Sequence, residues 1–76
     1  MKKEVTDQLV NRLKRIEGQV KAVQRMLEDG KTEPKQTLMQ LSAVISSLET
    51  TKIALVEEYT KDKIMASLES LSDLLK

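Results

Sequence analysis

The most distinctive chemistry in the sequence is a concentration of positive charge in its first third. Residues 1–25 hold seven lysines and arginines against three acidic side chains, whereas the rest of the chain holds six basic and nine acidic ones. At about 100° per residue of helix, Lys14, Lys21 and Arg25 cluster on one flank, and Arg12 and Arg15 lie on another. Basic side chains at this density neutralise the phosphates of a duplex and release counterions. We therefore predict a DNA-binding surface composed of Arg12, Lys14, Arg15, Lys21 and Arg25.

Two features of the composition weigh on that prediction. The same charges would also suit a solvated helix face, and the formal net charge of the chain is only +1. The single tyrosine, with no Trp or Phe, leaves almost nothing on which unpaired bases could stack. This composition argues against single-stranded targets and leaves contact with double-stranded DNA through its phosphates open.

No catalytic or cofactor site is predicted. The sequence has no His and no Cys, which excludes soft metal sites, imidazole or thiol nucleophiles and disulfides. Ser46 and Ser47 have no histidine to activate them, and Glu57 and Glu58 are neighbours that point to different sides of a helix. A hard-cation site formed by carboxylates alone, from Glu57, Glu58 and Asp62, remains a minor alternative.

The basic residues belong to the first of two predicted helices. Residues 6–28 carry apolar side chains at alternating spacings of four and three, which is a heptad pattern, and Thr6 or Asp7 is suited to cap the start. Gly30 and Pro34 then mark a turn. The heptad positions of the first helix are Leu9, Leu13, Ile16, Val20, Val23 and Leu27.

The second predicted helix covers residues 34–66 and is too long for its partner. Its heptad positions are Leu38, Leu41, Ile45, Leu48, Lys52, Leu55 and Tyr59. About 33 residues at 1.5 Å each span about 50 Å, so its distal half should pack on another protomer. Ser67 can cap a short third helix over residues 67–75, although no Gly or Pro excludes a continuous helix. Because the chain is so short, all of residues 1–76 are predicted to form one domain. A domain of this size needs other copies of itself to complete its core.

Several single residues have more than one interpretation. Gly18, with Ala22 one turn on, suggests close approach of a second surface or is a tolerated glycine. Lys52 interrupts the apolar heptad, where it can fix the register or extend its amine into water. Tyr59 and Lys63 form either a polar pocket or the amphipathic end of a helix. No apolar run reaches membrane-spanning length and Met1 is not followed by a leader-like segment, so we expect a cytoplasmic protein without membrane contact.

Three blocks of sequence carry a resemblance to a known family. They are residues 11–20 (NRLKRIEGQV), 24–30 (QRMLEDG) and 40–44 (QLSAV), followed by SLE at 47–49. These blocks resemble the CsoR/RcnR/FrmR family, small helical bacterial repressors that sense copper, nickel or cobalt, formaldehyde, or reactive sulfur. The resemblance covers roughly residues 6–66.

The resemblance implies an all-α fold, an antiparallel helix hairpin with a short C-terminal helix. Two protomers would form a four-helix bundle, and two such dimers a tetramer. It implies binding of operator DNA through the first helices, most directly by Arg12. The family often has a further basic residue at the position of Thr50, which this chain lacks.

The resemblance also locates the family's sensor positions, where this chain departs from the pattern. They correspond to Glu33 or Pro34 at the start of the second helix and to Tyr59 and Lys63 in its distal half, none of which is a thiolate or an imidazole. Pro34 and Tyr59 are 25 residues apart on one helix, roughly 37 Å, so only two antiparallel copies could bring them together. An ion pair between Glu33 and Lys63, or a bound anion, could replace the metal there.

The sequence thus predicts a DNA-binding repressor of this type without a thiolate or imidazole sensor site. The alternative is a helical interaction protein that pairs with a sensing paralogue and does not bind DNA itself.

Overall fold

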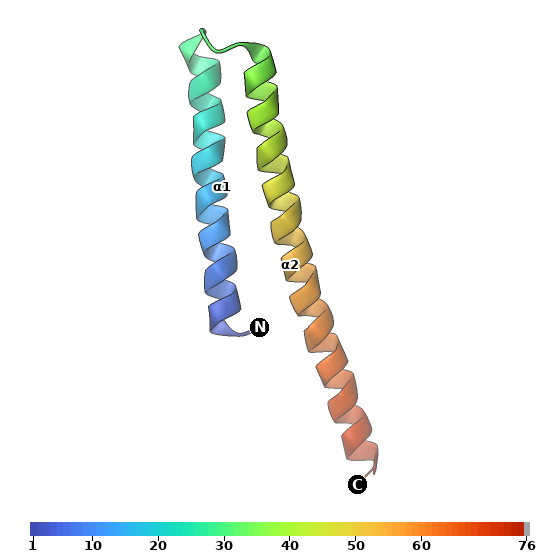
Figure 1. Ribbon diagram of the computed structural model, residues 1–76. Helices are drawn as coiled ribbons and strands as arrows, with labels where there is room; N and C mark the ends of the chain where they lie inside the picture. Colours follow the sequence, from blue (N-terminus) through green and yellow to red (C-terminus); the bar gives the residue numbers. More distant parts are fainter. Residues whose placement is uncertain (76) are drawn as a thin grey trace.

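Two antiparallel helices form the molecule. The computed structural model describes residues 1–75, in which α1 covers Lys3–Asp29 and α2 covers Pro34–Leu75, and the described residues contain no strand. α1 has 27 residues and α2 has 42, so α2 extends well beyond the N-terminal end of α1 (Figure 1). The resulting rod measures 69 × 20 × 11 Å. The predicted all-α hairpin is confirmed.

The turn between the helices is held by local hydrogen bonds. Gly30 adopts the left-handed conformation, with φ of 66°, and ends α1 as predicted. The Asp29 carboxylate accepts hydrogen bonds from the backbone N–H groups of Lys31 (2.8 Å) and Thr32 (3.0 Å) and from the Thr32 hydroxyl (2.8 Å). These bonds favour the charged form and lower the pKa of Asp29 below its ordinary value of 3.8.

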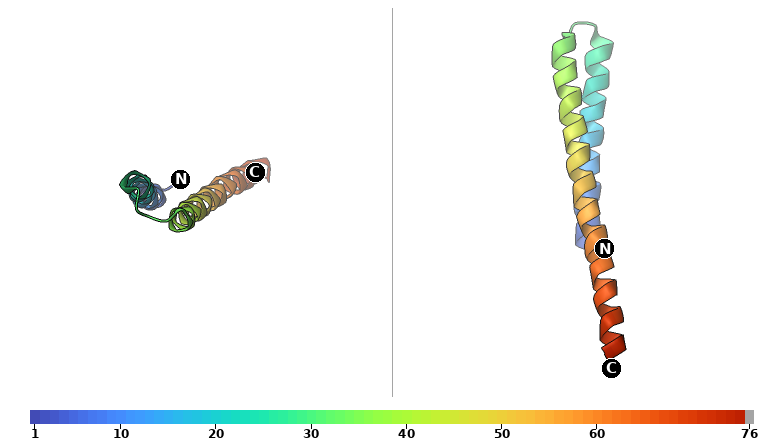
Figure 2. Two further views of the ribbon diagram at one scale, coloured as in Figure 1. Left: turned by 90° about the horizontal axis from the view of Figure 1, so that it is seen from above. Right: turned by 90° about the vertical axis from the view of Figure 1, so that its right-hand side faces the viewer.

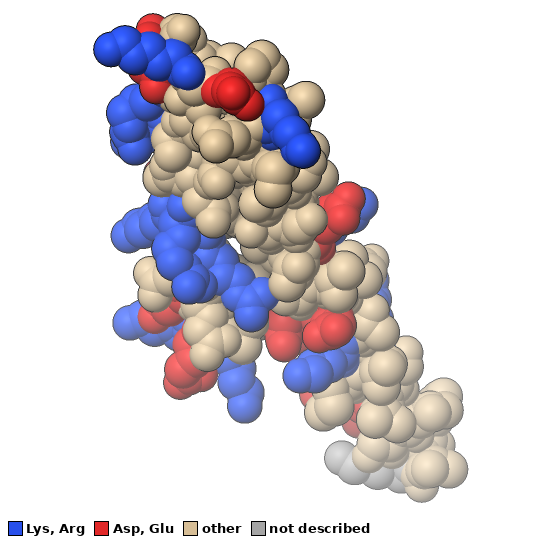
Figure 3. Space-filling view, turned by 45° about the horizontal axis from the view of Figure 1, so that its top comes forward, with Lys and Arg blue, Asp and Glu red and all other residues tan. Residues whose placement is uncertain are grey.

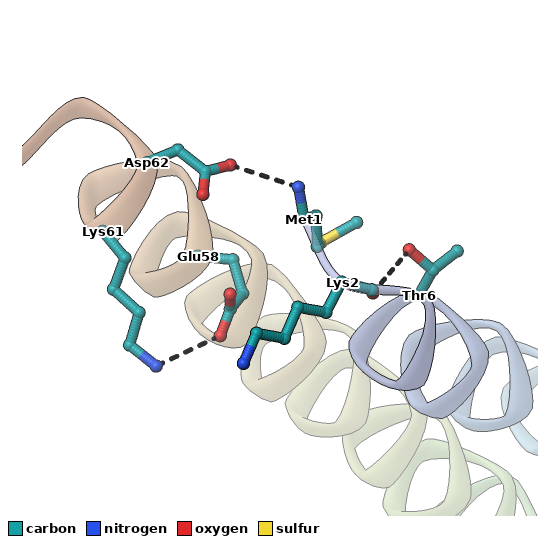
Figure 4. A network of polar contacts seen from close by, with 6 residues as sticks. All are labelled: Met1, Lys2, Thr6, Glu58, Lys61 and Asp62. Carbon is teal, nitrogen blue, oxygen red and sulfur yellow. Dashed lines mark hydrogen bonds and ion pairs between the residues drawn. The ribbon is translucent and has the colours of Figure 1, made fainter. Parts of the chain in front are cut away.

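The start of α1 differs from the prediction. The helix begins at Lys3, and Lys2 occupies the N-cap position without a side-chain hydrogen bond, so the predicted cap by Thr6 or Asp7 is wrong. The Thr6 hydroxyl instead donates to the Lys2 carbonyl at 3.3 Å, from inside the helix. The terminal amine of Met1 lies 3.5 Å from Asp62 Oδ2, which ties this end of α1 to α2 (Figure 4).

The separate C-terminal helix is also not formed. Residues 67–75 continue α2 without a break, because nothing after Pro34 interrupts the backbone hydrogen bonds. Every residue from 59 to 75 is exposed (Figure 2 shows this part of α2 projecting past α1). At 100° per residue, the apolar side chains of Ile64, Leu68, Leu71 and Leu75 point roughly 140° away from the heptad positions at 38–59.

The contact between the helices is narrow. α1 contributes the buried residues Leu9, Ile16 and Val23, and α2 contributes Thr37, Val44 and Thr51, each set spaced by seven. Within the described part of the chain, only Ile16, Val23 and Val44 form a buried apolar cluster. The two threonine hydroxyls donate to backbone carbonyls one turn earlier, at Glu33 (3.5 Å) and Ser47 (2.9 Å), so their burial leaves no unpaired hydroxyl.

The predicted heptad of the second helix does not make this contact. Its positions lie one residue further along the chain than those that face α1, and all of them are exposed; Leu41 is 42% exposed, Ile45 50% and Tyr59 62%. On α1, alternate predicted positions are buried, and Leu13, Val20 and Leu27 are exposed. Seven of these exposed aliphatic heptad positions are called the outer stripe below. They are Leu13, Val20, Leu38, Leu41, Ile45, Leu48 and Leu55.

The two glycines should respond oppositely to replacement by alanine. At Gly30 an added Cβ meets the steric cost of the left-handed conformation, and Gly30→Ala should destabilise the fold by about 1–2 kcal/mol. At Gly18 an added Cβ meets no atom within 4 Å, and Gly18→Ala should stabilise it by about 1 kcal/mol. Urea unfolding at one fixed protein concentration measures both effects. A loss of stability in Gly18→Ala would show that a surface outside this chain approaches Gly18.

Candidate nucleic-acid interface

The five predicted DNA-binding residues all lie on α1 but form two groups. Arg12 is partly buried and Arg15 is exposed, and both border a groove between the helices. Lys14, Lys21 and Arg25 are fully on the outside, on the side of α1 that is turned away from α2. We call the first pair the groove arginines and the other three the outer row. Figure 3 shows the basic side chains gathered along α1, some reaching toward α2.

The groove runs between the middle of α1 and the middle of α2. Its volume is about 420 Å³, and Ile16 and Thr51 form part of its lining where the helices meet. α1 lines it with Arg12, Arg15 and Gln19, and α2 lines it with Ser46, Ser47 and Thr50. The contact between the helices therefore also determines which side chains line the groove. α2 presents small hydroxyl side chains there, opposite two long basic side chains of α1.

No ion pair among residues 1–75 neutralises the charges of the groove arginines. No carboxylate lines the groove. The two ion pairs among residues 1–75 lie elsewhere, between Met1 and Asp62 and between Lys61 and Glu58 (3.4 Å), both near the free end of α1 (Figure 4). The groove is thus a region of uncompensated positive charge beside a partly buried floor, where an anion gains more than it would on an open surface.

Some of the remaining polar groups of the groove already make hydrogen bonds within the hairpin. The hydroxyls of Thr50 and Thr51 donate to the carbonyls of Ser46 (3.0 Å) and Ser47 (2.9 Å). Gln19 Oε1 is buried and has no hydrogen-bond partner among the described residues. The groove therefore contains one unpaired buried acceptor beside two guanidinium groups that can only donate.

The groove and the outer stripe lie on opposite faces of the hairpin. At 100° per residue, Arg12, Arg15 and Gln19 lie on one side of the α1 contact line, and Leu13 and Val20 lie on the other. Because the helices are antiparallel, the same division on α2 places Ser47 and Thr50 beside the arginines, and Leu41, Ile45 and Leu48 beside Leu13 and Val20. A partner on the apolar face would leave the groove open.

The positions equivalent to the family's sensor site are not brought together within one chain. Pro34 begins α2 beside the exposed Glu33, whereas Tyr59 and Lys63 lie in its distal half. Lys63 Nζ lies 5.6 Å from the centre of the Tyr59 ring, which is a cation–π contact at an exposed site. These two residues border a shallow hollow with Ile64 and Leu68 on one side of α2.

The other candidate features contribute no further site. Of the three carboxylates considered for a hard cation, Glu58 pairs with Lys61 and Asp62 with the terminal amine. No group of three or more His, Cys, Asp or Glu suited to a metal occurs in residues 1–75. Lys52 is exposed on α2, and none of the described residues, the adjoining helix backbone aside, lies within 4 Å of the position that a Cβ would take at Gly18.

Sequence reasoning missed the contribution of α2 to the groove. Only the folded hairpin shows that α2 lines the groove with Ser46, Ser47 and Thr50, and that Gln19 of α1 lies beside the arginines. A signal was present: Gln40, Val44, Ser47, Thr51 and Ala54 form a second heptad of smaller side chains one residue before the apolar one. Small residues at such spacing permit close approach of a helix. The neighbouring heptad of larger apolar side chains gives the stronger hydrophobic signal, so it is the one that the sequence predicts to face the first helix.

Comparison with known proteins identifies the family. Residues 5–76 match the family model described as metal-sensitive transcriptional repressor. The chain belongs to this family. It is 36% identical over 64 residues, 84% of its length, to the copper-sensing transcriptional repressor CsoR of Bacillus subtilis (strain 168).

The chain spans about three fifths, 62%, of the length of that Bacillus protein. No solved structure matches. The family comprises repressors of transcription rather than enzymes, and no described helix is long and apolar enough to cross a bilayer.

We expect the protein to bind thiophilic and borderline metals poorly, because the sequence has neither Cys nor His. Titration calorimetry with copper, nickel and zinc salts should show no stoichiometric binding at micromolar concentrations. A matched titration of a Tyr59→His variant controls for the sensitivity of the assay at the sensor-equivalent position. Tight copper binding by the unmodified chain would contradict the expectation.

Proposed function

We propose that this protein is a transcriptional repressor that binds double-stranded DNA and has no thiolate or imidazole sensor. The observation that supports this most is the uncompensated charge of Arg12 and Arg15 beside a groove that no carboxylate lines. The outer row of Lys14, Lys21 and Arg25 extends positive charge around the same helix. Phosphates of a duplex can contact both groups along α1, and these contacts give affinity and register. Such a regulator acts in the cytoplasm, where bacterial DNA lies.

The proposed repressor is an oligomer of this chain. The in-chain contact buries only three apolar side chains as a cluster, whereas the outer stripe leaves many large ones in water. Because these side chains are already about half covered, burying the rest of each one stabilises an assembly by about 1 kcal/mol, roughly half of what full burial from water contributes. A second hairpin packed on the stripe gives a four-helix bundle with both grooves facing outward, and two such dimers give the tetramer.

Charge supports an antiparallel arrangement of the two copies of α2. Lys52 lies at an exposed heptad position and takes part in neither ion pair among residues 1–75. When the stripes at 38–59 pair about their midpoint, Lys52 of one copy faces Ile45 of the other and lies about one helical turn from its Glu49. A Lys at such a position fixes the register by reaching a carboxylate at the edge of the interface.

The same arrangement places the sensor-equivalent residues of two copies closer together. The start of one α2 then approaches the distal half of the other, so that Glu33 and Pro34 come toward Tyr59 and Lys63. Glu33 and Lys63 would form an ion pair where a metal-sensing protein has its metal, or an anion would bind beside Lys63. Any effector of this repressor is therefore different from a thiophilic cation.

A second candidate is a helical interaction protein that pairs with a sensing paralogue. The extent of the outer stripe and the formal net charge of only +1 favour it. DNA binding by the isolated protein separates the two candidates.

Replacing single basic residues of α1 should weaken DNA binding. Arg12→Ala and Lys14→Ala should each reduce affinity for duplex DNA from the protein's own promoter region by about tenfold, because a charge-assisted hydrogen bond contributes about 1.5–3 kcal/mol. Each should also lower the slope of log affinity against log salt concentration by about one, because one phosphate fewer is neutralised on binding. Gel-shift titrations at several salt concentrations measure both quantities.

Lys35→Ala is the matched control for this experiment, since it removes the same charge from an exposed position on α2. Its affinity should stay within about twofold of the unmodified protein. Unchanged DNA binding in both Arg12→Ala and Lys14→Ala would show that these residues do not contact DNA and would contradict the repressor proposal.

A charge in the outer stripe should disrupt self-association. Leu48 is 44% exposed in the single hairpin and Met39, on another side of α2, is 64% exposed. Leu48→Glu should convert the assembly into smaller species, because a carboxylate would be buried in the interface, whereas Met39→Glu should leave it intact. Sedimentation velocity measures the sizes. A folded monomer of the unmodified protein at working concentration would contradict the oligomer.

A further inference from the structure

We propose that the groove between α1 and α2 is a binding site for a tetrahedral phosphate group, held by Arg12 and Arg15, and that free phosphate competes there with DNA. The competition rests on the proposed function, because it requires that a backbone phosphate of the duplex occupies the same groove. The phosphate site itself rests only on the residues that line it.

The first support is the unbalanced positive charge of the groove. Two arginines one helical turn apart project from α1, and neither takes part in an ion pair among the described residues. No carboxylate lines the groove to balance these two charges, and guanidinium groups can only donate hydrogen bonds. The complementary ligand is therefore an anion that carries several acceptor oxygens.

The second support comes from the facing helix. The hydroxyls of Thr50 and Thr51 donate to backbone carbonyls, whereas the Ser47 hydroxyl, on the side of α2 that faces the arginines, donates no hydrogen bond among residues 1–75. A serine hydroxyl can rotate to donate to an oxygen between the helices. A tetrahedral anion offers oxygens to both helices at once, whereas a planar carboxylate would satisfy the two arginines and leave Ser47 to water.

The third support is access. The groove lies on the face opposite the outer stripe, so self-association through the stripe leaves it open to solvent. Its volume of about 420 Å³ exceeds that of a single phosphate, which leaves room for a phosphate within a longer chain as well as for a free ion with water. The same site can therefore serve a nucleic-acid backbone and a small anion.

The site is tested first without DNA, using inorganic phosphate as the probe. Sodium phosphate is titrated into the full-length protein at constant ionic strength, with sodium chloride as the exchanged salt, and the side-chain resonances of Gln19 and of the arginines are followed by NMR. We expect saturable shifts at Gln19, Arg12 and Arg15 with a Kd in the millimolar range. Shifts no larger than those produced by chloride would overturn the site.

Variants then locate the site. Arg12→Gln should weaken phosphate binding by about tenfold and Arg15→Gln by several-fold, whereas Lys35→Gln should bind as the unmodified protein does. Circular dichroism checks that each variant keeps its helices; because Arg15 is exposed, Arg15→Gln remains a test even if Arg12→Gln unfolds. Equal phosphate binding in all three variants would show diffuse attraction to charge and overturn the proposal.

A competition experiment with DNA tests whether phosphate and DNA occupy the same groove. Phosphate should displace duplex DNA from the unmodified protein more strongly than chloride at equal ionic strength, and this excess should disappear in Arg15→Gln. Phosphate that saturates its site without displacing DNA would overturn the competition. Saturable phosphate binding by a protein that binds no DNA would instead overturn the proposed function and leave the anion site standing.

Discussion

The structure depends on a contact between α1 and α2 that is too narrow to bury the apolar side chains of the chain. Among residues 1–75, only Ile16, Val23 and Val44 form a buried cluster, because α2 turns threonines and smaller residues toward α1. The helices can lie close together along this line, but the bulkier leucines and isoleucines of α2 are left outside. The hairpin by itself therefore leaves most of its large apolar side chains in contact with water, as expected of so short a chain.

The same contact line separates two surfaces of different chemistry. On one face lie the leucines of the outer stripe, and on the other lie Arg12 and Arg15 with the hydroxyl side chains of α2. Self-association and anion binding can therefore coexist, since covering one face does not cover the other. This division matters for a member of a repressor family, because an assembly held together by its apolar faces presents one basic groove for each subunit.

The length of α2 adds a further constraint on assembly. Beyond Asp62, where the amine of Met1 marks the end of α1, every residue of α2 up to Leu75 is exposed. Its apolar residues there point away from the side that carries the outer stripe, so a single straight partner helix cannot cover both sets. The chain contains no Cys and no His, and the distal half of α2 carries Tyr59 and Lys63 in contact with each other.

Local rules determined the elements of this protein: the heptads required helices, Gly30 and Pro34 placed the turn, and the basic side chains of α1 followed from the sequence alone. The sequence alone, through residues 11–20 in particular, also carries the likeness to the family. Sequence could not decide which of two heptads on α2, one residue apart, would face α1, nor whether residues 67–75 would form a helix of their own. Only the folded hairpin decided that the smaller side chains pack inward and that Gln19, Ser47 and Thr50 meet the arginines. The reason is that packing compares the shapes of two surfaces, whereas periodicity records only which positions of one helix are apolar.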